Sequence, residues 1–407
     1  MRVVIAGAGY AGLTVALRLA RANFPGEVVL VNAGPYHQLL TQIHRVASGS
    51  VPPEKVLLRI ESLLRWYEVN FIEGKVTELW PDQRRVVLAD GRELTYDRLV
   101  VALGGQLDTL GVPGVREYAL AVCPVDQAVR TQQYITARLH DATFLTGAER
   151  EAALRFVIVG GGLTGVELAG ELADRLPQDA ARLGLRPSEL DIVIMEAGPR
   201  LLPLLDERSA ERATAFLERK RVSVRLETPV AEVYGVDSPY DEGAGGVVVQ
   251  GGQRVPARTV IWAAGMRGHE LVERAFAVDE RGRAYVDAYL RARDYPDVYL
   301  VGDCARAVPA GWTRPAAPTA QNAVAQAELV ADNLLQEATR GREAVLHPYE
   351  AKHVGTSAGP GAPGSEPPAG DFWKPRLSGF SAYAPKWSVE QRYTPSAGRR
   401  DSGGATD

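Results

Sequence analysis

The sequence predicts an α/β protein with two doubly wound, parallel-stranded dinucleotide-fold domains along its 407 residues. Twice in the chain, a short apolar run leads into a glycine-rich turn and then into a helical pattern. A second apolar strand follows each time, which is the order of a βαβ unit with a parallel sheet. The chain is long enough for two or three domains, each with its own core.

The first unit starts at the amino terminus, where the strand Arg2–Ala6 runs into Gly7-Ala8-Gly9-Tyr10-Ala11-Gly12 and a helix over residues 13–21. The first glycine permits the tight turn, the second lets the backbone approach a pyrophosphate, and the third lets the helix pack closely. Free N–H groups of the first helical turn then face the phosphate charge. The second strand ends at Asn32, where such motifs usually carry an acid, but an amide also hydrogen-bonds a ribose hydroxyl.

The second unit lies in the middle of the chain. The strand Arg155–Val159 runs into Gly160-Gly161-Gly162-Leu163-Thr164-Gly165, and a helix is expected over residues 166–176. Residues 177–188 are interpreted as an inserted helix and loop before the second strand, Asp191–Met195.

That second strand ends at Glu196. A carboxylate at this position accepts hydrogen bonds from both ribose hydroxyls and repels a 2′-phosphate, so NADH is favoured over NADPH. Arg200 stands nearby and weakens that preference. Two glycine loops in one chain imply two ligands, and FAD with a nicotinamide is the economical pairing, because hydride transfer needs a donor and an acceptor held together.

The remaining elements complete the expected domains. Strands are predicted at residues 99–103, 260–264 and 298–301, and antiparallel pairs at residues 86–97 and 246–256. Residues 355–375 are dense in Gly, Pro and Ser, which predicts a loop or disorder. The domains are expected to comprise residues 1–114 and 280–345 for FAD, 115–279 for NADH, and 346–407 for a C-terminal segment.

Composition excludes several classes of protein. The net charge of −4 gives no reason to expect a nucleic-acid partner. Cys123 and Cys304 are the only cysteines and have no CxxC spacing, which argues against a disulfide scaffold, a zinc site or a redox dithiol and fits a reducing cytosol. No metal site is expected. No run approaches the ~18–20 apolar residues of a membrane-spanning helix, so we expect the protein to lie on a bilayer rather than cross it or pump protons.

Four further segments are informative: YDRLVVALG at residues 96–104, TVIWAAG at 259–265, VYLVGD at 298–303, and PTAQ at 318–321 followed by Gln326. With TGVELAGEL after the second glycine loop, Tyr36-His37 and VASG at 46–49, they resemble type II NADH:quinone oxidoreductases over residues 1–354. This family belongs to the flavoproteins with two dinucleotide-binding domains, whose fold is like that of the pyridine nucleotide-disulfide reductases. The resemblance implies hydride transfer from NADH to FAD, then two-electron reduction of menaquinone or ubiquinone in a respiratory chain without proton pumping.

The resemblance also assigns residues. It places FAD against Gly7, Ala8, Gly9, Tyr10, Ala11, Gly12, Asn32, Ala33, Thr41, Val76, Gly104, Gly302, Asp303, Ala320 and Lys386. It places the nicotinamide nucleotide against Gly160, Gly162, Gly165, Glu196 and Gly265. In addition, Asp303 would hold the ribitol, Glu167 would lie beside the nicotinamide and the flavin, and Gln321 would border the quinone pocket.

Most of these side chains have a simpler interpretation. Glu167 follows a glycine loop closely, where an acid in a first helical turn is stabilised by the helix dipole. Asp303 is placed to cap a helix beginning near Ala305. Gln321 and Gln326 occupy an alanine-rich helix, where polar side chains usually face water. His37 is as well explained by a core or surface position as by catalysis, and Cys304 and Trp262 by packing.

The C-terminal segment predicts membrane association. Within residues 377–393, Phe380, Tyr383 and Trp387 fall on one face of a helix, and Lys386 and Arg392 are placed to meet lipid phosphates. Pro385 would kink this helix. We expect a peripheral protein on the cytoplasmic face of the cell membrane. The alternative is a helix packed on the protein's own surface. A homodimer is compatible with the sequence.

Three other functions stay open at this point. A disulfide reductase or a sulfide:quinone oxidoreductase needs paired redox cysteines, for which neither Cys123 nor Cys304 has a partner in sequence. An NAD(P)H-dependent reductase of a small iron–sulfur protein has no such requirement. A flavin-bound redox sensor or scaffold with slow turnover is the remaining possibility, from a different class.

Overall fold

The computed structural model describes residues 1–235 and 245–350. The expected helix over 377–393, with Lys386, and the Gly/Pro-rich residues 355–375 lie outside this part of the chain. Within it, no helix combines the length and apolar character needed to cross a bilayer.

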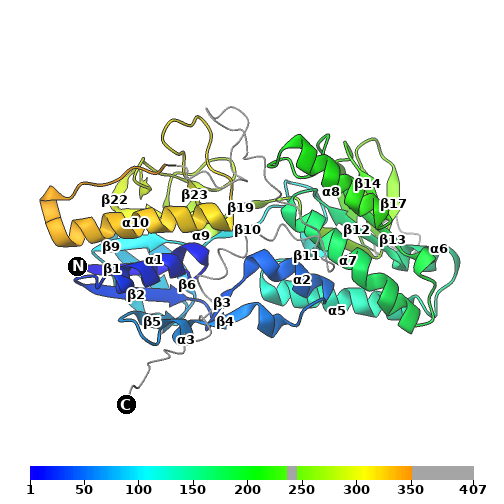
Figure 1. Cartoon of the computed structure of the whole chain (residues 1–407), viewed down its shortest axis with the longest axis horizontal. Coiled ribbons are helices and arrows are strands. Elements are labelled where there is room, and N and C mark those ends of the chain that lie inside the picture. The colour runs from blue at the N-terminus through cyan, green and yellow to red at the C-terminus, as the bar shows by residue number, and fades with distance from the viewer. Residues whose placement is uncertain (236–244, 351–407) are drawn as a thin grey trace, which may run out of the picture.

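A six-stranded sheet forms the core of the first lobe. Its strands, in spatial order, are β21 (Arg291–Ala292), β22 (Tyr295–Leu300), β9 (Arg98–Val101), β1 (Arg2–Ala6), β2 (Glu27–Asn32) and β5 (Asn70–Glu73). All neighbours pair in parallel except β21 and β22. Helices α1 (Tyr10–Arg21) and α10 (Ala320–Arg340) pack against each other along this sheet (Figure 1). The apolar runs seen in the sequence are buried here because both faces of the sheet are covered.

A five-stranded parallel sheet forms the core of the second lobe. Its order is β11 (Leu120–Ala121), β18 (Thr259–Trp262), β12 (Arg155–Val159), β13 (Asp191–Met195) and β14 (Val222–Arg225). Helices α5 (Val125–Asp141), α7 (Leu163–Arg182) and α8 (Glu207–Arg219) belong to this lobe. Trp262 is 2% exposed and packs in the core, as expected. The α/β fold class with two doubly wound units is therefore confirmed, while the residue bounds of the domains stay a prediction.

Smaller elements complete the two lobes. Antiparallel sheets form from β6 (Val76–Trp80), β7 (Arg85–Leu88) and β8 (Glu93–Thr95), and from β15 (Val230–Tyr234), β16 (Gly246–Val249) and β17 (Arg254–Pro256). The antiparallel pairs expected in both regions are confirmed, each with a third strand. Short elements are α3 (Ile60–Leu64), α4 (Val115–Tyr118), α6 (Gly147–Ala153), α9 (Glu270–Ala275), β20 (Ala284–Tyr285) and β23 (Ala305–Arg306).

Two features join the lobes. The first is an antiparallel ribbon of β10 (Gly105–Leu107) and β19 (Met266–Gly268), next to which the Trp262 indole N–H donates to the Asp108 carbonyl at 2.7 Å. The second is α2 (Ile43–Ser48), which lies between β3 (Tyr36–Gln38) and β4 (Leu57–Arg59) in the chain. Although it leaves from the first lobe, α2 packs against α5 and α7 of the second (Figure 1).

The interpretation of residues 177–188 as a separate inserted helix is wrong. Helix α7 continues through Pro177 to Arg182, and only the short turn Pro187–Glu189 follows. Proline removes one helical N–H donor, which disfavours a helix interior. Leu176 and Ala180 on either side are fully buried, so core packing holds the helix together across that position. Both glycine-loop helices also begin inside their loops, at Tyr10 and Leu163.

Candidate functional site

The first glycine loop has the geometry of a ligand cradle. Gly7 adopts φ +103°, which favours glycine, and a Cβ added to Gly12 would collide with the Gly7 carbonyl. A Cβ on Gly9 would meet no described atom within 4 Å, so the space above the loop is open where a pyrophosphate would approach. Asn32 Oδ1 accepts the Ala8 N–H at 3.0 Å, and its Nδ2 donates to the Gly34 carbonyl at 2.8 Å. The structure thus brings the loop and Asn32 together, as the sequence predicts.

The second glycine loop repeats this arrangement. Gly160 has φ +110°, a Cβ on Gly165 would collide with the Gly160 carbonyl, and a Cβ on Gly162 would meet no described atom within 4 Å. Glu196 takes the place of the asparagine, since its Oε2 accepts the Gly161 N–H at 2.6 Å. Its Oε1 accepts the Gly198 N–H at 2.7 Å.

The difference between the two strand-end side chains decides what each can still bind. The Asn32 amide uses both its oxygen and its nitrogen on backbone groups. The Glu196 carboxylate has about four acceptor positions, so it retains capacity for ribose hydroxyls after taking two backbone N–H groups. Arg200 donates to the carbonyls of Leu205 at 2.8 Å and Pro203 at 3.2 Å, so its guanidinium is engaged within its own loop.

Tyr10, His37 and Thr41 come together beside the first loop. The Tyr10 hydroxyl lies 2.8 Å from the Thr41 hydroxyl, and the Tyr10 ring meets the His37 ring edge to face at 5.1 Å. His37 Nδ1 is 2.8 Å from the Ala8 carbonyl, and the side chain is fully buried. Burial lowers its pKa to about 4, against the opposing effect of the Ala8 hydrogen bond. His37 is therefore a neutral core histidine that supports the loop.

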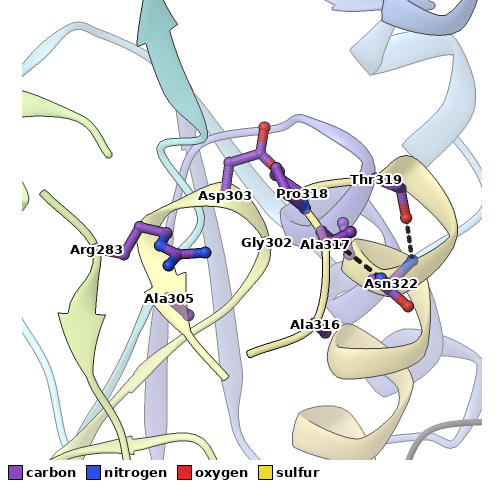
Figure 2. Close-up of a pocket in the computed structure, with 10 residues that line it drawn as sticks. Arg283, Gly302, Asp303, Ala305, Ala316, Ala317, Pro318, Thr319 and Asn322 are labelled. Atoms are coloured by element: carbon purple, nitrogen blue, oxygen red, sulfur yellow. Dashed lines mark hydrogen bonds between the residues drawn. The ribbon is translucent and has the colours of Figure 1, made fainter. Parts of the chain in front are cut away.

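A pocket opens beside Gly302 and Asp303 and has an empty volume of about 210 Å³. Figure 2 shows Asp303 and Arg283 on one side, with Ala317, Pro318 and Thr319 on the other. Burial raises the pKa of the Asp303 carboxyl to about 6, and the Arg283 charge acts in the opposite direction. No donor among the described residues hydrogen-bonds this carboxylate, so its oxygens are available to accept hydrogen bonds from a ligand in the pocket. The capping alternative is wrong, because Ala305 begins strand β23 instead of a helix.

The start of α10 forms the far side of this pocket. The Thr319 hydroxyl accepts the Asn322 N–H at 3.3 Å, and the Asn322 amide donates to the Ala317 carbonyl at 2.8 Å (Figure 2). Ala320 is the first residue of the helix, and Gln321 beside it is half-buried. The alternative interpretation, in which Gln326 faces water, is wrong. It is 3% exposed and its Oε1 accepts the Gly302 N–H at 2.7 Å, which ties the helix to the Asp303 segment.

Glu167 is the fifth residue of α7, beyond its first turn, and is 2% exposed. The interpretation of this acid as a first-turn residue stabilised by the helix dipole is therefore wrong. Its Oε2 lies 3.5 Å from Nδ1 of His44 on α2. Sequence reasoning missed His44, which stands just before the VASG segment at 46–49 and far from Glu167 along the chain.

Comparison with known proteins identifies the family. Residues 1–327 match the family model described as pyridine nucleotide-disulphide oxidoreductase. A type II NADH:quinone oxidoreductase of Staphylococcus saprophyticus is 33% identical over 336 residues, which cover 82% of this chain and 81% of that protein. The Staphylococcus aureus protein of the same name is 34% identical over 337 residues, with the same shares covered. This chain belongs to the type II NADH:quinone oxidoreductases.

Solved structures agree with the fold of this type II NADH:quinone oxidoreductase. NDH2 of Plasmodium falciparum, in complex with NADH, has a TM-score of 0.75 at 18% identity and covers 86% of each chain. A ferredoxin reductase of Rhodopseudomonas palustris has a TM-score of 0.67 at 23% identity, covering 86% of this chain and 78% of that one. At these identities the likeness shows the shared fold and does not distinguish electron acceptors.

The cysteines of this type II NADH:quinone oxidoreductase are free thiols. Cys304 is fully buried and its Sγ donates to the Val301 carbonyl at 3.1 Å, which confirms a packing role. Burial raises the pKa of both Cys123 and Cys304 to about 12, so neither forms a reactive thiolate at neutral pH. Over the described ranges, no cluster of His, Cys, Asp or Glu could hold a metal ion.

The positions of four other predicted site residues do not by themselves indicate a ligand. Gly104, with φ +70°, and Gly265 each stand directly before a strand of the interlobe ribbon. Val76 begins β6 and is 7% exposed, and Ala33 follows β2. The assignment of these residues to ligands stays a prediction, and Lys386 lies outside the described residues.

Replacing Gly9 or Gly12 with alanine should have different effects, because the space around the added Cβ differs at the two positions. Gly12→Ala should destabilise the protein by about 1–3 kcal/mol, because its Cβ collides with the Gly7 carbonyl. Gly9→Ala should keep the melting temperature of the FAD-free protein near that of the wild type but release FAD more readily, because its Cβ enters the open space above the loop. Thermal unfolding and flavin fluorescence of the filtrate measure both. Equal melting temperatures for the two variants would contradict this account.

The buried His37 predicts acid sensitivity. Its folded pKa of about 4 lies below the ordinary value of 6.5, so the unfolded chain binds the proton first and stability falls as pH drops from 6.5 towards 4. The full shift is worth up to about 3 kcal/mol. His37→Asn keeps a donor for the Ala8 carbonyl without a titrating ring, so urea unfolding at pH 7 and pH 5 should show a smaller loss for the variant. An equal loss in both proteins would rule this out.

Proposed function

We propose that this protein oxidises NADH with FAD bound at the first glycine loop and delivers two electrons to a quinone without pumping protons. The observation that carries this proposal is the pair of intact glycine loops with matching geometry in one chain. Relatives at 33% and 34% identity are named type II NADH:quinone oxidoreductases, which supports the same activity here. When bound, FAD supplies the two-electron chemistry, and the chain supplies binding, orientation and electrostatics.

On the FAD side, the chain offers donors for phosphates and an acceptor for hydroxyls. The open space at Gly9 lets backbone N–H groups at the start of α1 meet the pyrophosphate. Asp303, whose carboxylate lines the pocket, would accept hydrogen bonds from the ribitol. The positive end of α10 begins at Ala320, where backbone N–H groups would face the isoalloxazine.

On the nicotinamide side, the open space at Gly162 would admit the second pyrophosphate and Glu196 would hold the adenosine ribose. Two features favour NADH over NADPH. The Glu196 carboxylate would repel a 2′-phosphate, and Arg200 is engaged by two carbonyls of its own loop instead of standing ready to bind one.

Quinone is the proposed acceptor, at a pocket bordered by Gln321 on α10. The buried thiols Cys123 and Cys304 offer no disulfide relay, which disfavours the cysteine-dependent reductases of this fold. A small iron–sulfur protein is the remaining enzymatic alternative, and nothing among residues 1–235 and 245–350 favours it.

An acceptor assay tests the proposed function. The purified yellow protein should oxidise NADH rapidly with a short-chain quinone, slowly with ferredoxin or rubredoxin, and slowest with oxygen alone. NADPH should be a poorer donor than NADH with the same quinone. The decay of nicotinamide absorbance measures each rate. A rate that does not depend on quinone would refute the quinone assignment.

We also propose that the protein works as a peripheral enzyme on the cytoplasmic face of the cell membrane. The amphipathic pattern of residues 377–393, with Phe380, Tyr383 and Trp387 on one face, supports this proposal. Lys386 within it is the expected basic contact to lipid phosphate or FAD. A homodimer is also part of this proposal, and it rests on the sequence-based expectation alone.

Vesicle flotation tests the membrane proposal. The full chain should float with vesicles containing anionic lipid, and a variant ending at residue 376 should stay in the dense fraction. A truncated protein that still reduces a water-soluble quinone provides the folding control. Equal flotation of the two proteins would show that residues 377–407 do not seat the enzyme on lipid.

A further inference from the structure

His44 and Glu167 form a buried pair where α2 of the first lobe meets α7 of the second. His44 Nδ1 and Glu167 Oε2 are 3.5 Å apart, and their side chains are 5% and 3% exposed. Glu167 stands two residues after Gly165, so the carboxylate belongs to the helix that starts at the proposed NADH site. The histidine comes from a segment that leaves and re-enters the proposed FAD lobe. The pair therefore joins elements of the two lobes.

The Glu167 carboxylate is buried, so its contacts contribute to the stability of this region. An ionised carboxylate out of water is costly unless it is paired or hydrogen-bonded, and breaking a buried pair by removing one partner strands the other. An imidazole Nδ1 facing Oε2 supplies such a partner. His44 is thus one contact that helps to hold the Glu167 carboxylate in position.

Further contacts fix α2 along the same face of α7. Arg45 Nε lies 3.7 Å from Glu171 Oε1, and the Arg175 guanidinium donates to the Ser48 carbonyl at the end of α2. Glu167, Glu171 and Arg175 are spaced four residues apart, so they lie along one stripe of α7. Arg175 is itself paired with Asp179 at 2.8 Å. The charged groups facing the pair from α2 and α7 are thus already matched with one another.

We propose that His44 is a positioning residue that helps to hold the Glu167 carboxylate, through Nδ1, in the place needed for NADH oxidation. This inference rests on the proposed function and adds a residue to it. His44 is assigned no contact with NADH, FAD or quinone. Its role is to orient Glu167, as α2 orients His44.

Three variants separate hydrogen bonding from mere space filling. His44→Asn places an amide N–H where Nδ1 was, His44→Gln moves that N–H outward, and His44→Leu removes it. Arg45→Met is the matched control, because it removes the contact of α2 with Glu171 but leaves both the Arg175 contact at the end of α2 and the His44–Glu167 pair. Each protein is purified with FAD, and NADH-driven loss of the oxidised flavin absorbance is followed anaerobically.

We expect His44→Leu and His44→Gln to slow this reduction by at least about tenfold at saturating NADH, with little change in the NADH concentration giving half the maximal rate. His44→Asn and Arg45→Met should stay within about threefold of the wild type. Adding Glu167→Gln to His44→Leu should cause no further loss of rate, because both changes remove the same unit. Rates for His44→Leu and His44→Gln that match the wild type, or losses that multiply in the double variant, would overturn the inference.

Thermal unfolding of the FAD-loaded proteins gives a readout independent of turnover. His44→Leu should lower the melting temperature by removing a contact of the buried Glu167 carboxylate, and the further change Glu167→Gln should restore part of it. Simple additivity of the two shifts would show that the residues are not coupled. If wild-type flavin is not reduced by NADH at all, the proposed function fails, whereas normal reduction with unaffected His44 variants defeats only this inference.

Discussion

The close seating of each glycine-loop helix against its own loop is the constraint from which the rest of the site follows. Gly12 and Gly165 lie so near the carbonyls of Gly7 and Gly160 that no side chain fits between them. This contact fixes where α1 and α7 begin and therefore which backbone N–H groups face a ligand. The strand-end side chains Asn32 and Glu196 then complete each loop by accepting its second N–H group. The two glycine loops thus repeat the same local arrangement of a tight turn, a closely packed helix and a strand-end acceptor.

That local character explains what the sequence could predict. Glycine turns, apolar strands and strand-end polar residues lie within a few tens of residues of one another, so their pattern determines their arrangement. The same reasoning identified the return strands and the packing of Cys304 and Trp262. The family resemblance supplied the acceptor, which no local pattern could have given.

The features that sequence reasoning missed all depend on tertiary contacts. Gln326 sits on an alanine-rich helix that looks solvent-facing, yet it accepts the Gly302 N–H because α10 packs over that segment. Helix α7 passes through Pro177 because Leu176 and Ala180 are buried on either side. The His44–Glu167 pair joins residues from different lobes, and no spacing rule connects them.

The excursion of α2 into the opposite lobe has a mechanical consequence. A single antiparallel ribbon between two lobes would act as a hinge, and the lobes could then open and close around their ligands. Here α2 makes a second attachment between the lobes besides the β10–β19 ribbon, through the contacts of Arg45 and Arg175. The placement of the two glycine loops relative to each other is therefore tied to the folding of α2 as well as to the ribbon.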